Sequence, residues 1–97
     1  MIRSFRDKDL EMFFYSQGQI HADCVPSQLR KIVYRKLREI NQARDTRDLR
    51  NVPSNHLEKL SSSKKYSIRV NQQYRLIFLW QNNYAYEVEI NKHDKKY

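Results

Sequence analysis

The sequence predicts an α+β fold in which two N-terminal helices pack on an antiparallel sheet of three to five strands. Apolar residues recur about every 3.6 residues up to residue 44, as in an amphipathic helix, and at every second residue from residue 66 onward, as in a strand. Helices that precede a run of strands are typical of α+β domains. The length of 97 residues fits one domain, so we expect residues 1–97 to fold as a single unit.

The N-terminal quarter is expected to contain a short strand and the first helix. Residues 2–5 alternate apolar and polar side chains, which is a weak strand signal. Asp7 or Asp9 is a suitable N-cap, because its carboxylate can accept a hydrogen bond from the backbone of the first helical turn. Gly18 should end this helix, since glycine adopts the left-handed conformation at little cost. The helix carries four large apolar residues: Leu10, Met12, Phe13 and Phe14.

A longer helix is predicted from Pro26 or Ser27 to about Arg44. Its apolar residues form one stripe, which should face the core: Leu29, Ile32, Val33, Leu37 and Ile40. Its basic residues form the other face, which should be exposed to solvent: Arg30, Lys31, Arg35, Lys36 and Arg38. Residues 45–56 contain a proline and no clear period, so we interpret them as a connecting loop.

The second half of the chain predicts a meander of strands. Residues 66–70 alternate clearly, residues 74–80 are apolar enough for a central strand, and residues 85–90 alternate again. Short polar segments at 71–73 and 81–83 are suitable hairpin turns. Residues 56–60 are a candidate for a further strand that leads into the first of the three.

The chain is strongly basic, and its charge is unevenly distributed. The 19 Lys and Arg residues outnumber the 11 Asp and Glu residues, which gives a net charge of +8. Residues 1–25 have a net charge of −1, whereas residues 26–50 carry +5 and residues 61–97 carry +4. A small domain with this balance most often binds a polyanion, usually nucleic acid. The alternative is a charged surface that only keeps the protein in solution.

The composition argues against several other classes of protein. The only glycine is Gly18, which excludes a glycine-rich phosphate-binding loop. The only cysteine is Cys24, which excludes an internal disulfide and a thiolate zinc cage. The longest uncharged apolar run, residues 76–80, is far too short to cross a bilayer, and the N-terminus lacks the apolar segment of a secretory signal. We therefore expect a cytoplasmic protein without a metal, a cofactor or a membrane partner.

Side chains that could cleave RNA gather in the strand half of the chain. Arg69 and Arg75 lie on neighbouring strands of a predicted hairpin, and Lys64 and Lys65 precede it. The last strand is followed by Lys92, His93, Asp94, Lys95, Lys96 and Tyr97. Cleavage of RNA by its own 2′-hydroxyl needs a base, an acid and cations, and these residue types supply them without a metal. Each residue taken alone is more simply a solvated or paired surface group.

Several stretches of the chain resemble the HigB-type branch of the RelE-like bacterial toxins. They are residues 1–5, 37–43, 48–50 with Pro53, 55–60, 66–76 with Phe78 and Trp80, and 85–90. The stretch 66–76 reads Tyr-Ser-Ile-Arg-Val-Asn-Gln-Gln-Tyr-Arg-Leu and is the most specific of them. The stretches are spread from residue 1 to residue 90, so the resemblance spans nearly the whole chain.

The resemblance implies a compact RelE-like toxin that enters the ribosomal A site and cleaves messenger RNA. It implies catalytic roles for Arg75, Arg69 and His93. By their charge or position, six further residues suit RNA binding: Lys64, Lys65, Lys92, Lys95, Lys96 and Tyr97. The resemblance also implies a cognate antitoxin, commonly a HigA-like helix-turn-helix protein, through which the pair binds operator DNA and represses its promoter.

Two segments depart from the family pattern and keep a second interpretation open. Relatives usually have a Lys-Gly-Asp-Arg-like stretch where this chain has Ser-Ser-Ser-Lys-Lys at residues 61–65, and often Asp-Tyr-His where it has Lys-His-Asp at residues 92–94. The second interpretation is a catalytically weak module that binds RNA or the ribosome within an antitoxin-repressor complex. The third is a plain RNA-binding α+β protein without toxin activity.

Overall fold

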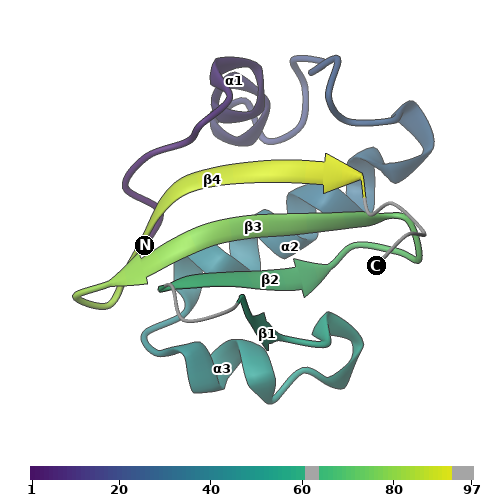
Figure 1. Ribbon diagram of the computed structural model, residues 1–97. Coiled ribbons are helices and arrows are strands. Elements are labelled where there is room, and N and C mark those ends of the chain that lie inside the picture. The colour runs from purple at the N-terminus through teal and green to yellow at the C-terminus, as the bar shows by residue number, and fades with distance from the viewer. Residues whose placement is uncertain (61–63, 93–97) are drawn as a thin grey trace.

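Four antiparallel strands form one sheet in the order β1-β2-β3-β4, and helices cover one of its faces (Figure 1). The computed structural model describes residues 1–60 and 64–92. The α-helices are α1 (Lys8–Tyr15), α2 (Arg30–Gln42) and α3 (Thr46–Arg50), with 3₁₀ turns at Ser27–Leu29 and Pro53–Asn55. The strands are β1 (Glu58–Lys59), β2 (Lys65–Arg69), β3 (Tyr74–Gln81) and β4 (Tyr84–Lys92). The predicted α+β architecture is confirmed, with helices first and the sheet after them.

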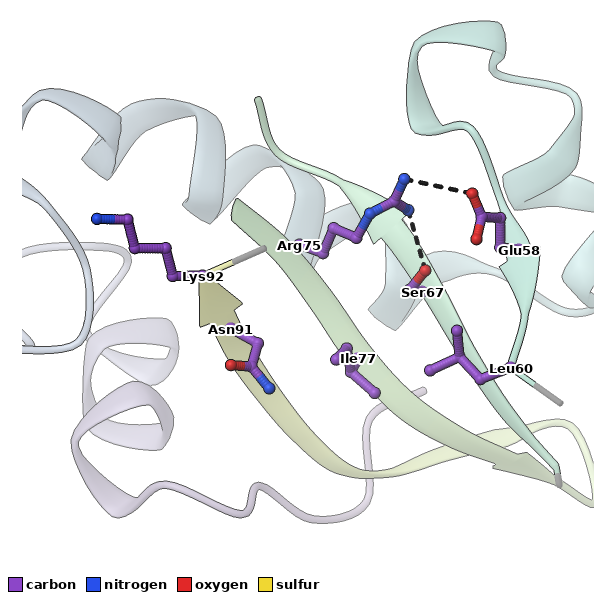
Figure 2. A pocket seen from close by; sticks show the side chains of 7 residues that line it. All are labelled: Glu58, Leu60, Ser67, Arg75, Ile77, Asn91 and Lys92. Carbon is purple, nitrogen blue, oxygen red and sulfur yellow. Dashed lines mark hydrogen bonds and ion pairs between the residues drawn. The ribbon is translucent and has the colours of Figure 1, made fainter. Parts of the chain in front are cut away.

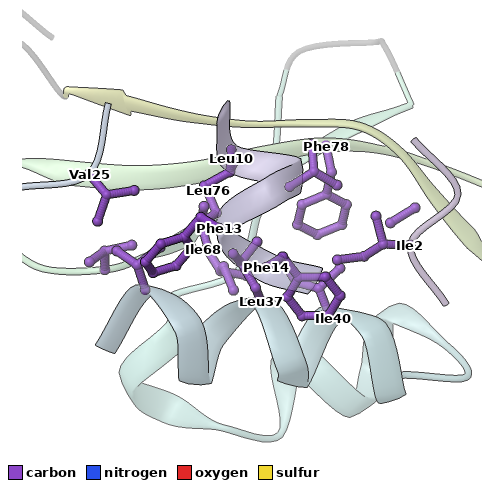
Figure 3. Packing of buried hydrophobic residues seen from close by; sticks show 14 of the residues in the cluster. Ile2, Leu10, Phe13, Phe14, Val25, Leu37, Ile40, Ile68, Leu76 and Phe78 are labelled. Atoms are coloured by element: carbon purple, nitrogen blue, oxygen red, sulfur yellow. The ribbon is translucent and has the colours of Figure 1, made fainter. Parts of the chain in front are cut away.

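Helix α1 begins where the sequence predicts and ends slightly earlier, at Tyr15, with Ser16 as its C-cap and Gln17 (φ +60°) as the first left-handed residue before Gly18. The carboxylate of Asp7 is the N-cap and accepts a hydrogen bond of 2.8 Å from the backbone N–H of Asp9. After the helix, Gly18 has a φ of +81°, in the left-handed region that glycine adopts without a steric penalty. The helix buries Leu10, Phe13 and Phe14, and this apolar side anchors it beside β4 and α2 (Figure 3).

Helix α2 lies across the inner face of the sheet, as its apolar stripe requires (Figure 1). Val33, Leu37 and Ile40 have no exposed surface, and they pack against Ile68 and Leu76 of the central strands in one cluster (Figure 3). Burial of each such side chain contributes about 1.5–3 kcal/mol to folding. The sheet therefore has a covered inner face and an open outer face.

Lys36 does not lie on the solvent face of α2 as predicted. Its side chain is 2% exposed, because the 3₁₀ turn that follows α3 folds back over it. Its ammonium group donates hydrogen bonds to Ser54 Oγ at 3.1 Å and to Asn55 Oδ1, and lies 3.9 Å from Glu39 Oε1. Burial lowers the pKa of Lys36 from its usual value, against the opposing attraction of Glu39. A cationic side chain thus ties the segment before β1 to the core helix.

The predicted loop at residues 45–56 contains the short helix α3, so that part of the prediction is wrong. The carboxylate of Asp45 caps α3 by accepting a hydrogen bond of 2.8 Å from the backbone N–H of Arg47. This bond lowers the pKa of Asp45. Leu49 supplies the only buried side chain of the helix. Because only one of the five residues of α3 is apolar, the sequence shows no hydrophobic period there. The helix was therefore not predicted.

The three predicted strands are confirmed. The first is shifted by one residue, from 66–70 to 65–69, and the other two are extended slightly. The turn between β3 and β4 is Asn82-Asn83, with φ values of +53° and +67°, as the tight hairpins favoured by sheet twist require. Glu87, with a φ of +52°, lies at the irregularity in the pairing of β3 with β4. The candidate strand at 56–60 is the two-residue strand β1, which pairs with β2 at the edge of the sheet.

The segment predicted as a strand at residues 2–5 forms two isolated bridges to β4 instead. Ile2 bridges Ala85, and Phe5 bridges Val88, both in the parallel sense. The backbone N–H groups of Ala85 and Val88 donate to Met1 and Ser4 carbonyls at 3.0 and 3.1 Å. The first residues of the chain therefore protect the β4 edge of the sheet.

Candidate active site on the open face of the sheet

Arg69 and Arg75 face each other on the open side of the sheet. They are directly paired residues of β2 and β3, and side chains at paired positions project from the same face. Like charges at such positions normally destabilise a sheet, by a fraction of a kcal/mol up to about 1 kcal/mol. Two arginines at paired positions place two cationic side chains on one face of the sheet, where they can attract an anion.

The guanidinium of Arg75 is fixed in direction by two contacts. Nη1 donates to Ser67 Oγ at 3.0 Å, and Nη2 donates to Glu58 Oε1 at 3.3 Å (Figure 2). Ser67 is 1% exposed, and the side chain of Arg75 is 13% exposed, whereas that of Glu58 is 59% exposed. The two contacts occupy only some of the N–H donors of the guanidinium. Arg75 can therefore still donate hydrogen bonds to a bound anion. Among the described residues, the side chain of Arg69 has no hydrogen-bond or ion-pair partner.

A cavity of about 280 Å³ opens beside Arg75. Its walls come from β1, the residue that follows it, and the outer faces of β2, β3 and β4: Glu58, Leu60, Ser67, Arg75, Ile77, Asn91 and Lys92. Ile77 and Asn91 lie next to each other on neighbouring strands, and the Lys92 side chain points away from the middle of the cavity (Figure 2). The cavity therefore has an apolar floor, a cationic wall and an amide.

The structure brings together only some of the residues predicted for the site. Arg69, Arg75 and Lys92 lie at one end of the sheet, since Tyr74 next to Arg75 pairs with Lys92. Lys65 is at the other end of β2, four residues from Arg69, which places it about 13 Å away along the strand. Lys64, which is exposed, directly precedes Lys65. Four predicted residues lie outside the described part of the chain: His93, Lys95, Lys96 and Tyr97.

Sequence reasoning missed five residues of this site: Glu58, Leu60, Ser67, Ile77 and Asn91. Ser67 and Ile77 share the strand face of Arg69 and Arg75, so the alternation of the strands contained a signal for them. Asn91 pairs with Arg75, but only the register of β4 reveals this. Glu58 belongs to a strand of two residues, and no local pattern links it to Arg75 across β2.

The described residues contain neither a metal centre nor a membrane-spanning helix. Within residues 1–60 and 64–92, no group of three or more His, Cys, Asp and Glu side chains is arranged to hold a metal ion. Over the same ranges, no helix has the length and apolar content that a membrane crossing needs.

Cys24 is expected to react slowly with thiol reagents. Burial, together with the charge and hydrogen bond of Asp7, raises the pKa of Cys24 from 9.0 to about 12. The thiolate is the nucleophile, so at pH 8 we expect alkylation by iodoacetamide about 10- to 100-fold slower in the folded protein than in urea. Glutathione in the same two buffers is the control. Equal rates for folded and unfolded protein would contradict the assignment.

Comparisons with known proteins agree with this architecture. The sequence pattern of the family described as RelE-like toxin of type II toxin-antitoxin system HigB matches residues 3–93. An uncharacterized protein of Haemophilus influenzae is 44% identical over 91 residues, which are 92% of this chain and 88% of that protein. Toxin HigB-1 of Vibrio cholerae is 39% identical over 95 residues, which are 96% of this chain and 98% of the toxin.

The fold also has a counterpart among solved structures. A chain of the YoeB-YefM complex from Staphylococcus aureus superposes with a TM-score of 0.50 over 92% of this chain and 95% of its own length, at 20% identity. At that identity the likeness concerns the fold alone. The family match and the HigB-1 likeness span almost the whole chain, including both strands that carry the facing arginines. The chain therefore belongs to the HigB-like family of RelE-like toxins of type II toxin-antitoxin systems.

Proposed function

We propose that this protein is an endoribonuclease toxin that cleaves messenger RNA on the ribosome and thereby stops translation and growth. The observation that carries the proposal is the pair of arginines, Arg69 and Arg75, at directly paired positions on an open sheet face, with a cavity beside Arg75. A planar, permanently charged fork matches the non-bridging oxygens of a phosphodiester. The buried hydroxyl of Ser67 and the carboxylate of Glu58 hold one fork in place, so that little freedom is lost when RNA binds.

The proposed reaction uses the RNA itself as nucleophile. The 2′-oxygen attacks the adjacent phosphorus, the bond from phosphorus to the 5′-oxygen breaks, and the products are a 2′,3′-cyclic phosphate and a 5′-hydroxyl. Arg75 and Arg69 stabilise the negative charge that develops on the phosphorane oxygens. The proton of the 2′-hydroxyl passes to a base, and the leaving oxygen receives one from an acid. His93 is our candidate for one of these roles, because imidazole titrates near neutral pH.

The remaining partners are proposed from the family. A type II toxin has a cognate antitoxin, and the similar solved structure is titled as a complex, which supports a protein partner for this chain as well. We propose a HigA-like helix-turn-helix antitoxin, with operator DNA bound only through it. The basic residues Lys64, Lys65 and Lys92 would contact the RNA backbone, together with Lys95, Lys96 and Tyr97. A cytoplasmic location follows from the proposed action on ribosomes.

One observation favours the weaker alternative, a toxin-like module that occupies the ribosome without efficient cleavage. Glu58 already neutralises part of the charge of Arg75. A carboxylate next to the scissile phosphate would repel it and lower the rate.

Translation of a reporter mRNA in a cell-free bacterial extract, followed by sequencing of all mRNA 5′ ends, tests the proposal. We expect new 5′-hydroxyl ends inside codons when the toxin and translating ribosomes are both present, and none with ribosomes blocked before initiation. Inhibited translation with intact mRNA would instead support the weak module. Undiminished translation would refute both functions.

A further inference from the structure

We propose that the cavity beside Arg75 binds the nucleobase attached to the phosphate that the two arginines hold, and that Asn91 reads this base. The inference rests on the proposed function, since it assigns the substrate of the same site in more detail. It makes Asn91 a specificity-determining residue, with Leu60 and Ile77 as the apolar surfaces that receive the base.

The cavity suits one base in size and lining. Its volume of about 280 Å³ is just below the range of small-molecule pockets, which begins at about 300 Å³, so it admits one base but not a stack of several. The apolar side chains of Leu60 and Ile77 form part of the wall, and the Asn91 amide turns toward them (Figure 2). Flat apolar contact with one or two hydrogen-bonding groups is how proteins bind an unstacked base.

The positions of Asn91 and Arg75 match the geometry of a nucleotide. They are directly paired on β4 and β3, and Ile77 follows Arg75 on the same face. Paired Cβ atoms lie about 4.5–5.5 Å apart, so the amide and the guanidinium serve neighbouring parts of one ligand. One sugar joins a base to its phosphate, and a phosphate on Arg75 would therefore direct its base toward Asn91.

The charges around the cavity favour a nucleotide with its phosphate beside Arg75 and its base beside Asn91, and not the opposite arrangement. Arg75 attracts the phosphate to the cationic wall, and Arg69 lies across the strand pair from it. Glu58 lies at the other side of the Arg75 guanidinium and repels an anion that moves beyond it. The apolar floor and the amide remain for the uncharged part of the nucleotide. A neutral amide has one donor and one acceptor group, and it can therefore match some base edges and not others.

Base preference at the cleavage site tests this inference. In the cell-free assay, we expect the wild-type protein to prefer one base at a fixed position beside the cut, and Asn91→Ala to reduce that preference by about 5- to 100-fold. The readout is a ratio of cut frequencies, which is independent of the overall rate. Gln81→Ala, which removes an exposed outer-face amide at the far end of β3, is the matched control and should leave the ratio unchanged.

Each outcome either supports or overturns the inference. A wild-type preference that Asn91→Ala retains, or cutting with no preference at all, would overturn it and leave the proposed nuclease intact. If the wild-type protein does not cleave RNA, the proposed function is refuted. Titration of the protein with the four nucleoside 3′-monophosphates then tests the base pocket by itself. Shifts of the Ile77 methyl and Asn91 amide NMR signals that differ among the four nucleotides would support the pocket. No such shifts at millimolar nucleotide would overturn it.

Discussion

Replacing Arg75 by alanine is expected to slow RNA cleavage by about 100- to 1,000-fold. Arg75 is held by Ser67 and Glu58 on a strand whose other face is buried, so its guanidinium meets the developing phosphorane charge without reorganisation. Loss of one oriented donor from such a transition state costs about 2.7–4 kcal/mol. The cell-free cleavage assay measures the rate, and growth after induction measures toxicity. Arg35→Ala, on the exposed face of α2, is the matched control.

A structural role for Arg75 makes a different prediction. The carboxylate that it contacts is Glu58 of β1, and not Glu87 or Glu89 of β4, which are nearer in sequence; Glu89 pairs with Arg6 instead. An ion pair with one half-exposed partner contributes about 0–1 kcal/mol, so its loss alone should hardly change the melting temperature. Full toxicity of a folded Arg75→Ala variant would refute the catalytic role. If Glu58→Ala and Arg75→Ala lost stability and activity to the same extent, the role of the Glu58–Arg75 ion pair would be to stabilise the fold.

Replacing Lys36 by methionine is expected to reduce the free energy of unfolding by about 1–3 kcal/mol. Methionine fills a similar volume but leaves the Oδ1 atom of fully buried Asn55 without its donor, and an unpaired buried acceptor costs that amount. The melting temperature should fall by about 5–20 °C in a calorimetric scan. Lys31→Met, the same change on the exposed part of α2, is the control and should shift it little.

The pH dependence of this effect has a defined sign. The folded state lowers the pKa of Lys36 below its usual value of 10.5. Between the folded value and 10.5 the unfolded chain therefore holds more protons, and the contribution of Lys36 to stability rises with pH. Below that window both states are protonated and the contribution is constant. The stability difference between wild type and Lys36→Met should show this rise. A variant as stable as the wild type would mean that desolvation of the ammonium outweighs its hydrogen bonds.

Strong local periodicity made most of the fold predictable. The stripe from Val33 to Ile40 and the alternation of β2 determine which faces are buried, and the hairpin places Arg69 opposite Arg75. Features that depend on contacts between distant segments were not predictable. Lys36 looks like a surface residue until the turn at Pro53–Asn55 covers it, and Glu58 reaches Arg75 only because β1 pairs with β2.

The bridges between the N-terminal segment and β4 determine when the toxin can finish folding. Ile2 and Phe5 meet Ala85 and Val88, more than 80 residues further along the chain. Contacts between such distant residues form slowly, because most of the chain must be ordered first. During synthesis the first residues must wait for β4, the last strand to be made. A nascent chain that lacks β4 has neither a completed sheet edge nor Asn91 and Lys92, so the cell is exposed to the finished site only after β4 has been translated.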